Sequence, residues 1–450
     1  MNSGMHATRS GGWYTVGVLS LLYAVSIVDR QIMPIAVIDV RRSLGISDFE
    51  VSLMMGFAFG LFYTLCGLPI GAAVDRYPRR WIIWTGMMVW SLAAAACGLA
   101  RSGIQLFAAR MGVGAGEAAI SPAAYSIMSD LFPKTRLAGP ISVYTMGGTL
   151  GAALSVYIGG TLLQYFSIAG GVRIGAFAVL QPWQALFVVT GLPGLAISLL
   201  VFTITEPRRD PLPKIVPRRD VSFMIFIRTE WRLLTLLLGG FGVAAMLPYG
   251  LGAWIPTLLR REYGVNPAQI GRTYGLIAAG CGLAAHGSNG FVVDWLFRRG
   301  VKAAHLWFFI GSAAIAAPLA ALGFISGSYR YTLLAIVATN LILTPFIGYA
   351  AAAVQLITPP GMHGRMSALF LFVISVFGLG AGPSAVAALT DFVFHSDAAL
   401  GRSLAVFILV VSACAAVLLA CARGPFQAAV TRASSGSSSR LRMSVSICEN

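Results

Sequence analysis

Apolar runs longer than about 18 residues recur along the whole chain, and a run of this length is typical of a helix that crosses a membrane. The composition agrees, because 57% of the 450 residues are hydrophobic and only 11% are charged. An ordinary soluble domain is roughly 45–50% apolar and about 25% charged. The chain therefore lacks the charge to cover several soluble domains, and it is expected to be a polytopic membrane protein.

The apolar stretches predict an all-α integral membrane fold with twelve transmembrane helices in two six-helix bundles. The predicted helices lie near 13–38, 50–74, 81–100, 103–130, 138–165, 184–204, 233–258, 267–293, 303–325, 331–357, 366–393 and 402–422. The prolines and charges of 205–231 predict a cytoplasmic linker. The domains expected are therefore 1–204, the linker 205–231, 232–423 and a Ser-rich tail, 424–450, predicted to be disordered.

The charge balance of +16 comes from 32 basic and 16 acidic residues. In a membrane protein the basic excess indicates orientation, since basic loops stay on the cytoplasmic side. With the N-terminus inside, 21 Lys and Arg residues lie inside and nine outside, so both termini are predicted to be cytoplasmic. We expect a multi-pass protein of the inner (plasma) membrane, a monomer in the lipid bilayer, with no nucleic-acid partner. The scattered cysteines imply no metal site.

An internal repeat appears when the chain is shifted by 219 residues against itself. The shift places Arg41-Arg42 on Arg260-Arg261, Gly45 on Gly264, Ser47 on Asn266, Gly56 on Gly275, Gly71 on Gly290, Asp75 on Asp294 and Arg79-Arg80 on Arg298-Arg299. Ser47 and Asn266 are good N-caps for the second helix of each half. Six helices per half place the two halves in the same orientation, which is the parallel repeat of one large class of secondary transporters.

The end of the second helix carries Gly71, Asp75, Arg76, Arg79 and Arg80 in the segment GAAVDRYPRR. A carboxylate beside arginines at a helix end can bridge to a neighbouring helix and be released when the helices separate. The second half repeats the spacing with Gly290, Asp294, Arg298 and Arg299. This motif resembles the signature loop of the major facilitator superfamily, in which it serves as a conformational switch. Pro78 and Trp295 depart from the family pattern.

Four ionisable residues within the predicted spans are singled out as candidates for proton coupling and substrate contact. They are Asp29 and Arg30 in the first span and Arg110 and Glu117 in the fourth. A charge at mid-bilayer costs at least ~2.5–3.5 kcal/mol, so such residues are functional candidates by default. Arg110 and Glu117 are two turns apart on one helix face. The depths of the four residues allow Asp29 to meet Arg110, Glu117 or both; the alternative role is a static ion pair.

Several segments together resemble the Spinster-like branch of the superfamily. They are SIVDRQIMP in helix 1, RMGVGAGEAAISP in helix 4, TEPRR after helix 6, GAWIPTLLRR in helix 7 and GLGAGP in helix 11. The resemblance implies an alternating-access carrier in which Asp29 exchanges with Arg110 as protons and substrate come and go. No organic cofactor or metal is expected, and the proton is the expected coupling ion. In the second half, His286 and Asn340 are the polar candidates for a substrate cavity.

These features predict a secondary active transporter of a small amphipathic or anionic solute, either lysolipid-like or an organic anion. A multidrug–proton antiporter and a sugar-acid or organic-anion symporter are the alternatives within transport. An enzyme acting on lipids would need a clustered nucleophile or His/Asp/Glu constellation, which the five scattered histidines do not supply. A non-transporting membrane sensor is the alternative from a different class.

Overall fold

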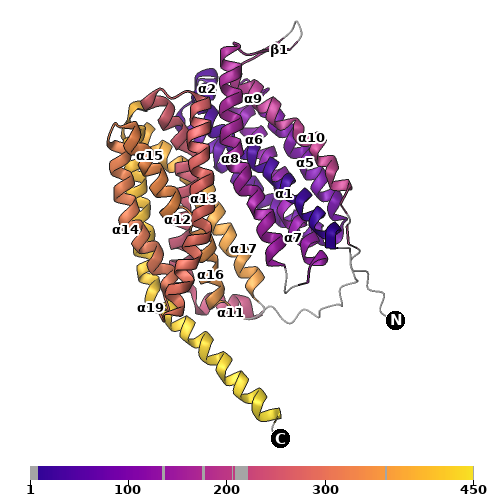
Figure 1. The fold of residues 1–450 in the computed structure, drawn as a ribbon, viewed down its shortest axis with the longest axis vertical. Coiled ribbons are helices and arrows are strands. Elements are labelled where there is room, and N and C mark those ends of the chain that lie inside the picture. The colour runs from indigo at the N-terminus through magenta and orange to yellow at the C-terminus, as the bar shows by residue number, and fades with distance from the viewer. Residues whose placement is uncertain are drawn as a thin grey trace. The chain divides into compact units, whose positions relative to one another are not determined.

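Helices occupy all twelve predicted places in the computed structural model, which describes residues 9–133, 137–174, 178–204, 206–207, 221–359 and 362–448 (Figure 1). Among these residues, ten helical stretches are long and apolar enough to cross a membrane. The third and fourth predicted spans are not among the ten, and the fourth is divided by a helix break after Glu117. The all-α membrane fold predicted from the sequence is confirmed.

The chain forms two compact units. Unit 1 holds residues 1–214 together with 250–280 and 383–400, and unit 2 holds 215–249, 281–382 and 401–450. Two stretches from the second half of the chain therefore pack with the first half.

The first half of the chain supplies most of unit 1. Its elements are α1 Arg9–Gln31, α2 Met33–Leu44, α3 Asp48–Met55, α4 Phe57–Arg76, α5 Arg79–Cys97, α6 Gly103–Glu117, α7 Ile120–Leu131, α8 Ala138–Ile168, β1 Val172–Ile174, β2 Ala178–Leu180, α9 Pro182–Gly191, α10 Pro193–Ser198 and η2 Leu199–Phe202. α1 packs along α8, and α6 packs on both α4 and α5. β1 and β2 form an antiparallel hairpin in which Val172 pairs with Leu180.

The second half of the chain contains the longest helices. Its elements are α11 Val221–Thr229, α12 Trp231–Tyr263, α13 Pro267–Arg298, α14 Ala304–Ile325, α15 Tyr329–Ala338, η3 Thr339–Leu343, α16 Ile347–Ile357, α17 His363–Ile374, η4 Ser375–Ala381, α18 Gly382–Ala388, η5 Leu389–Val393, η6 Asp397–Ala399 and α19 Leu400–Cys448. η3, η4 and η5 are π-helical. Within unit 2, α14 packs against α15 and α16.

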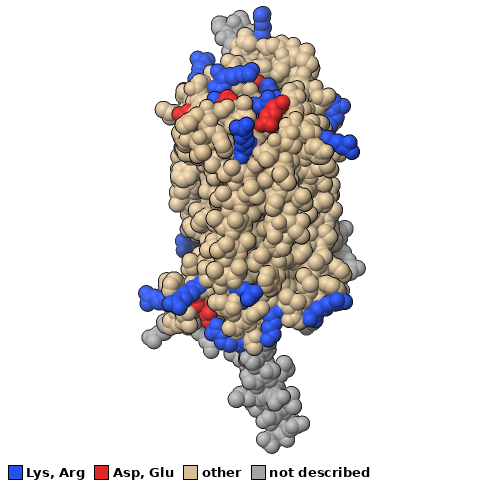
Figure 2. All heavy atoms as spheres, turned by 90° about the vertical axis from the view of Figure 1, so that its left-hand side faces the viewer, with Lys and Arg blue, Asp and Glu red and all other residues tan. Residues whose placement is uncertain are grey.

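The surface agrees with a membrane environment. Figure 2 shows charged side chains gathered toward the two ends of one face, with a middle that is almost free of them. On α14, Ile315, Leu319 and Leu322 are 62%, 56% and 62% exposed. Exposed apolar side chains in such a row favour contact with lipid over water.

Prolines break the first and fourth spans directly after their charged residues. Pro34 lies in the first turn of α2, and as a proline it has no N–H to donate to the carbonyl of Arg30. Pro122 in α7 likewise cannot donate to the carbonyl of Ala118. α1 therefore ends one residue after Arg30, and α6 ends at Glu117.

The internal repeat is confirmed in the backbone and in the caps. Gly45 and Gly264 both adopt left-handed conformations, with φ of 65° and 63°, which a residue without Cβ reaches at no steric cost. The Ser47 hydroxyl accepts the backbone N–H of Glu50 at 3.1 Å. The Asn266 side chain accepts the N–H of Gln269 at 2.9 Å. The two halves thus enter their second helices in the same way.

The linker and tail are described only in part. Residues 205 and 208–220 of the predicted linker lie outside the described residues, and α11 occupies 221–229. The sequence predicted disorder after Arg423, whereas the structure continues α19 to Cys448. Pro425 is the last proline of the chain, so no later residue lacks a backbone N–H for helix bonding.

Glycines let α6 approach its neighbours closely. A side chain at Gly116 would lie 2.5 Å from the backbone nitrogen of Trp90 and 2.6 Å from the carbonyl oxygen of Gly86 on α5. A side chain at Gly114 would lie 3.1 Å from the carbonyl carbon of Phe59 on α4. These distances leave no room for a side chain at Gly114 or Gly116, and the close packing holds α6 between α4 and α5.

Gly116→Ala is expected to destabilise the protein by about 1–3 kcal/mol, because the added methyl group would clash with the backbone of α5. The measurement is the thermal unfolding midpoint of the purified protein in detergent. Gly17→Ala in α1 is the matched control, since no atom lies within 4 Å of its added methyl group. The Gly17→Ala variant should be as stable as the parent protein or more stable by about 0.5–1 kcal/mol. Equal losses in both variants would contradict the packing argument.

Candidate functional site

The structure brings the four predicted intramembrane charges together in unit 1. Asp29, Arg110 and Glu117 are only 2%, 1% and 2% exposed, and the Arg30 side chain is 17% exposed. Two acids and two bases leave the group formally neutral. We call these four residues the intramembrane cluster.

Arg30 and Glu117 form the ion pair of the intramembrane cluster. The Arg30 Nε donates to Glu117 Oε2 at 2.9 Å, and Arg30 Nη2 donates to the same oxygen. The Arg30 guanidinium also lies over the rings of Phe59 and Tyr63, 4.5 Å and 5.3 Å from their centroids. Since a buried ion pair is costly without further contacts, the aromatic rings help to retain this charge.

Arg110 is held less completely than Arg30. Its Nε donates to the backbone carbonyl of Met54 on α3 at 3.2 Å, while its Nη2 is buried and has no hydrogen-bond partner among the residues that the structure describes. Its guanidinium lies 5.7 Å from the centroid of the Phe59 ring. A buried guanidinium with an unused N–H is free to donate to an anionic group.

Asp29 is the buried acid without a hydrogen bond. Both carboxyl oxygens are buried and neither has a hydrogen-bond partner among the described residues. Glu117 and Arg110 both act on this carboxyl electrostatically, and the side chains of Thr190 and Trp90 lie close enough to interact with it, although neither meets the geometry of a hydrogen bond. The resemblance to known carriers implied contact between Asp29 and Arg110, but in this structure Glu117 is paired with Arg30 and no hydrogen bond joins Asp29 to Arg110.

The first copy of the switch motif centres on Arg79, which the sequence had only placed in a loop. Arg79 is fully buried, and its backbone N–H and side-chain Nε donate to Glu206 Oε1 at 2.6 Å and 3.3 Å. Its Nη1 donates to Ser126 at 3.0 Å and to Asp130. Arg80 Nε donates to Glu206 Oε2 at 3.2 Å. Arg79 therefore ties the start of α5 to α7 and to the chain after η2.

The other motif residues are more exposed. Asp75 and Arg76 lie exposed at the end of α4, and Gly71 has open space where a side chain would stand. The sequence did not identify Asp130 or Ser126 as partners of Arg79. Glu206 does stand in the TEPRR segment, so a signal for it existed.

The second copy of the motif makes different contacts. Arg298 Nε donates to the Asp294 carbonyl of its own helix at 3.3 Å. The Arg299 guanidinium lies 4.0 Å from the ring centroid of Trp295, the residue that replaces Arg76 in the repeat. Gly290 again has open space beside it. The sequence repeat therefore does not repeat the anchoring role of Arg79.

Asn289 is a buried polar residue of unit 2 that the sequence analysis did not identify. Asn289 is 8% exposed, and its Nδ2 donates to the carbonyl of Leu341 in the π-helical segment η3 at 3.1 Å. Asn340, a predicted cavity residue, donates to the carbonyl of Ile336 in its own helix at 2.8 Å. The side chain of His286 lies outside the described part of the structure.

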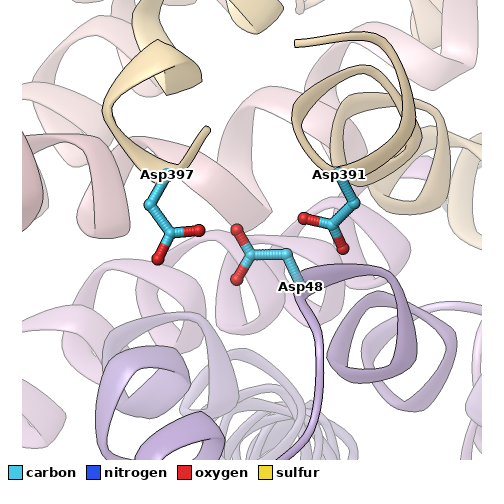
Figure 3. Close-up of side chains that lie close together, drawn as sticks. All are labelled: Asp48, Asp391 and Asp397. Carbon is cyan, nitrogen blue, oxygen red and sulfur yellow. The ribbon is translucent and has the colours of Figure 1, made fainter. Parts of the chain in front are cut away.

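Unit 1 also contains a cluster of acids and arginines that the sequence analysis did not predict. The side-chain oxygens of Asp48, Asp391 and Asp397 lie within 4.8 Å of one another and point toward a common centre (Figure 3). Three carboxylates in such proximity are one arrangement that suits a divalent cation. Here, however, Arg261 donates to both oxygens of Asp48 at 2.6 Å and 2.7 Å, so arginine already occupies those ligand positions.

The fold and the buried charges define a multi-pass membrane transporter. The family model described as Major Facilitator Superfamily matches residues 19–383, and the chain belongs to this superfamily. Members of this family are transporters, so the chain is a transporter and not an enzyme.

Three comparisons show what the chain resembles. The MFS-type efflux pump of Mycolicibacterium smegmatis is 26% identical over 410 residues, covering 90% of this chain and 91% of that protein. The probable L-galactonate transporter of Escherichia coli is 26% identical over 319 residues, covering 66% of this chain and 65% of that protein. The structure of an inward-facing, unoccupied bacterial homologue of the human lysosomal transporter Spinster matches with a TM-score of 0.76 and 24% identity, covering 94% and 98% of the two chains.

Arg79→Gln is expected to lower stability by about 3 kcal/mol, because Glu206 and Asp130 lose a buried partner. Thermal unfolding in detergent measures the loss. Arg298→Gln, at the equivalent position of the repeat, should change the midpoint little, since Arg298 is exposed and contacts its own helix. A stability loss as large in Arg298→Gln would contradict the unequal roles of the two copies.

Proposed function

We propose that the protein couples proton movement to the transport of a small organic anion by alternating access. The observation that carries the proposal is the intramembrane cluster, in which a buried carboxyl without a hydrogen bond lies among two guanidinium groups and a second acid. Charges of this kind inside membrane helices mark substrate and proton pathways.

The anionic substrate class is supported by two observations. Arg110 has a buried N–H that no described residue accepts, and the Arg30 side chain is 17% exposed, so a solute can contact it. A guanidinium binds a carboxylate or phosphate through paired hydrogen bonds. The similarity to a probable L-galactonate transporter favours a sugar acid as the anion.

A second candidate function is efflux of an amphipathic compound. The similarity to an MFS-type efflux pump extends over 90% of this chain. The aromatic rings of Phe59 and Tyr63 lie beside the charge of Arg30, an arrangement that suits a ligand with an apolar part and one charged group. A lysolipid-like molecule has this chemistry as well.

The coupling proton is assigned to Asp29. An ionised carboxylate without hydrogen bonds in an apolar interior is strongly disfavoured, and both a proton and a contact with Arg110 remove that cost. Protonation of Asp29 and release of Arg110 therefore favour each other. The released Arg110 is then available to the solute anion.

The protein is further proposed to reside in the inner membrane as a monomer with both termini cytoplasmic. The loops predicted to be cytoplasmic carry 21 Lys and Arg residues and those on the other side carry nine, which supports this orientation. The proposal includes no metal or organic cofactor.

Asp29→Asn is expected to abolish uptake driven by an imposed pH gradient in proteoliposomes while exchange of labelled galactonate for unlabelled galactonate continues. The amide cannot carry the proton, but the solute site keeps both arginines. Arg110→Ala is expected to weaken galactonate binding about tenfold, the typical loss for a hydrogen bond to a charged group. Flux assays with and without the gradient measure both effects.

Arg101→Gln is the control for these variants, because Arg101 is an exposed arginine of unit 1 outside the intramembrane cluster. Full gradient-driven uptake by Asp29→Asn would refute the coupling role. A thermal-shift screen against sugar acids, lysolipids and cationic drugs at two pH values separates the substrate classes. Stabilisation by drugs alone would favour the efflux function.

A further inference from the structure

The repeated arginine pairs, Arg41-Arg42 and Arg260-Arg261, meet at one end of unit 1. They line a hollow of about 580 Å³ together with Ile38, Asp397 and Ala398. The first pair belongs to α2, in the first half of the chain, and the second pair ends α12, in the second half. The repeat thus places like-charged pairs from both halves in one location.

Four aspartates neutralise this location. Arg260 donates to both oxygens of Asp39, with Nη2 and Oδ1 3.0 Å apart. Arg261 holds both oxygens of Asp48, whose side chain is fully buried. Arg41 donates to Asp397, and its Nη1 is 3.6 Å from Asp48. Asp391 accepts the backbone N–H of Phe49 at 2.7 Å.

The equal numbers of arginines and aspartates favour an ion-pair seal over an anion-binding site. Four of these contacts join the two halves of the chain: Arg260 to Asp39, Arg261 to Asp48, Arg41 to Asp397 and the backbone of Phe49 to Asp391. Ser52 donates to Ser384 at 3.2 Å, and a side chain at Gly160 would meet the carbonyl of Pro267. The helix ends of the two halves are therefore in direct contact here.

We propose that seven of these residues, Asp39, Arg41, Asp48, Arg260, Arg261, Asp391 and Asp397, form a latch that holds this end of the carrier closed and must be broken whenever the solute pathway opens there. The proposal rests on alternating access in the proposed function. It follows from the geometry that the arginines hold the latch together: without Arg261, the clustered carboxylates of Asp48, Asp391 and Asp397 repel one another. Loss of an arginine should therefore open this end more than loss of an aspartate.

The test uses the alkylation rate of Ser52→Cys by a membrane-impermeant maleimide, in a full-length protein whose native cysteines are replaced. Ser52 is fully buried beside Ser384, so its alkylation reports opening and needs no solute. Arg261→Gln should raise the rate about tenfold, the effect of a shift near 1.4 kcal/mol in the closed–open equilibrium. Adding Asp391→Asn should bring it back toward the starting value, since the repulsion falls.

Arg42→Gln is the matched control, because Arg42 lines the same hollow but is exposed and forms no side-chain hydrogen bond or ion pair with the residues that the structure describes. It should leave the alkylation rate unchanged. Asp39 and Arg260 provide a second test, since each side chain is 21% exposed and tolerates exchange better than Asp48. Arg260→Asp should speed alkylation, and the swap Asp39→Arg with Arg260→Asp should restore it.

Unchanged alkylation in both Arg261→Gln and Arg260→Asp would overturn the latch, as would acceleration that neither Asp391→Asn nor the charge swap reverses. The rates are measured on protein that is monodisperse in gel filtration. The alkylation rate does not depend on transport. A negative flux assay therefore refutes the proposed function and leaves the latch standing, whereas a negative alkylation result refutes the latch alone.

Discussion

The structure of unit 1 depends on neutralising charge in places where water does not reach. An isolated buried charge is prohibitively expensive, so each buried arginine here requires a carboxylate, an aromatic face or a backbone carbonyl. Arg30 has Glu117 and two aromatic rings, Arg79 has Glu206 and Asp130, and Arg261 has Asp48. The buried acid Asp29 differs from these groups, because its carboxyl oxygens have no hydrogen-bond partner among the described residues. The incompletely stabilised carboxyl is therefore the group whose charge state is easiest to couple to movement.

Proline positions explain why this exception can exist. α1 ends directly after Arg30, and α6 ends at Glu117, because Pro34 and Pro122 interrupt the hydrogen bonding of the following turn. The charged residues thus lie at helix ends inside the apolar region, where the backbone already departs from regular geometry. Helix breaks at membrane depth are characteristic of binding sites in carriers. The glycines of α6 then allow the neighbouring helices to approach the break closely.

The sequence predicted the fold well because apolar run length and cap chemistry are local properties. The twelve helices and the Ser47 and Asn266 caps follow from neighbouring residues. Partner choice is a tertiary property, and there the sequence was limited. Depth along the spans placed the four intramembrane charges at compatible levels, but it did not reveal that Arg30, rather than Arg110, pairs with Glu117. Asp391 and Asp397 had no motif around them, so the latch emerged only from the fold.

The repeat shows how one duplicated sequence supports two different mechanical roles. The glycine φ angles and helix caps agree in both halves, so the duplication preserved the backbone. The contacts of the arginines did not follow. Arg79 is buried against residues of α7 and the chain after the sixth span, while its counterpart Arg298 donates a hydrogen bond to the Asp294 carbonyl of its own helix. A carrier that alternates between two states needs firm contacts within a bundle and breakable contacts between halves. In this chain Arg79 supplies contacts of the first kind, whereas Arg260 and Arg261 join segments from opposite halves and so supply the second.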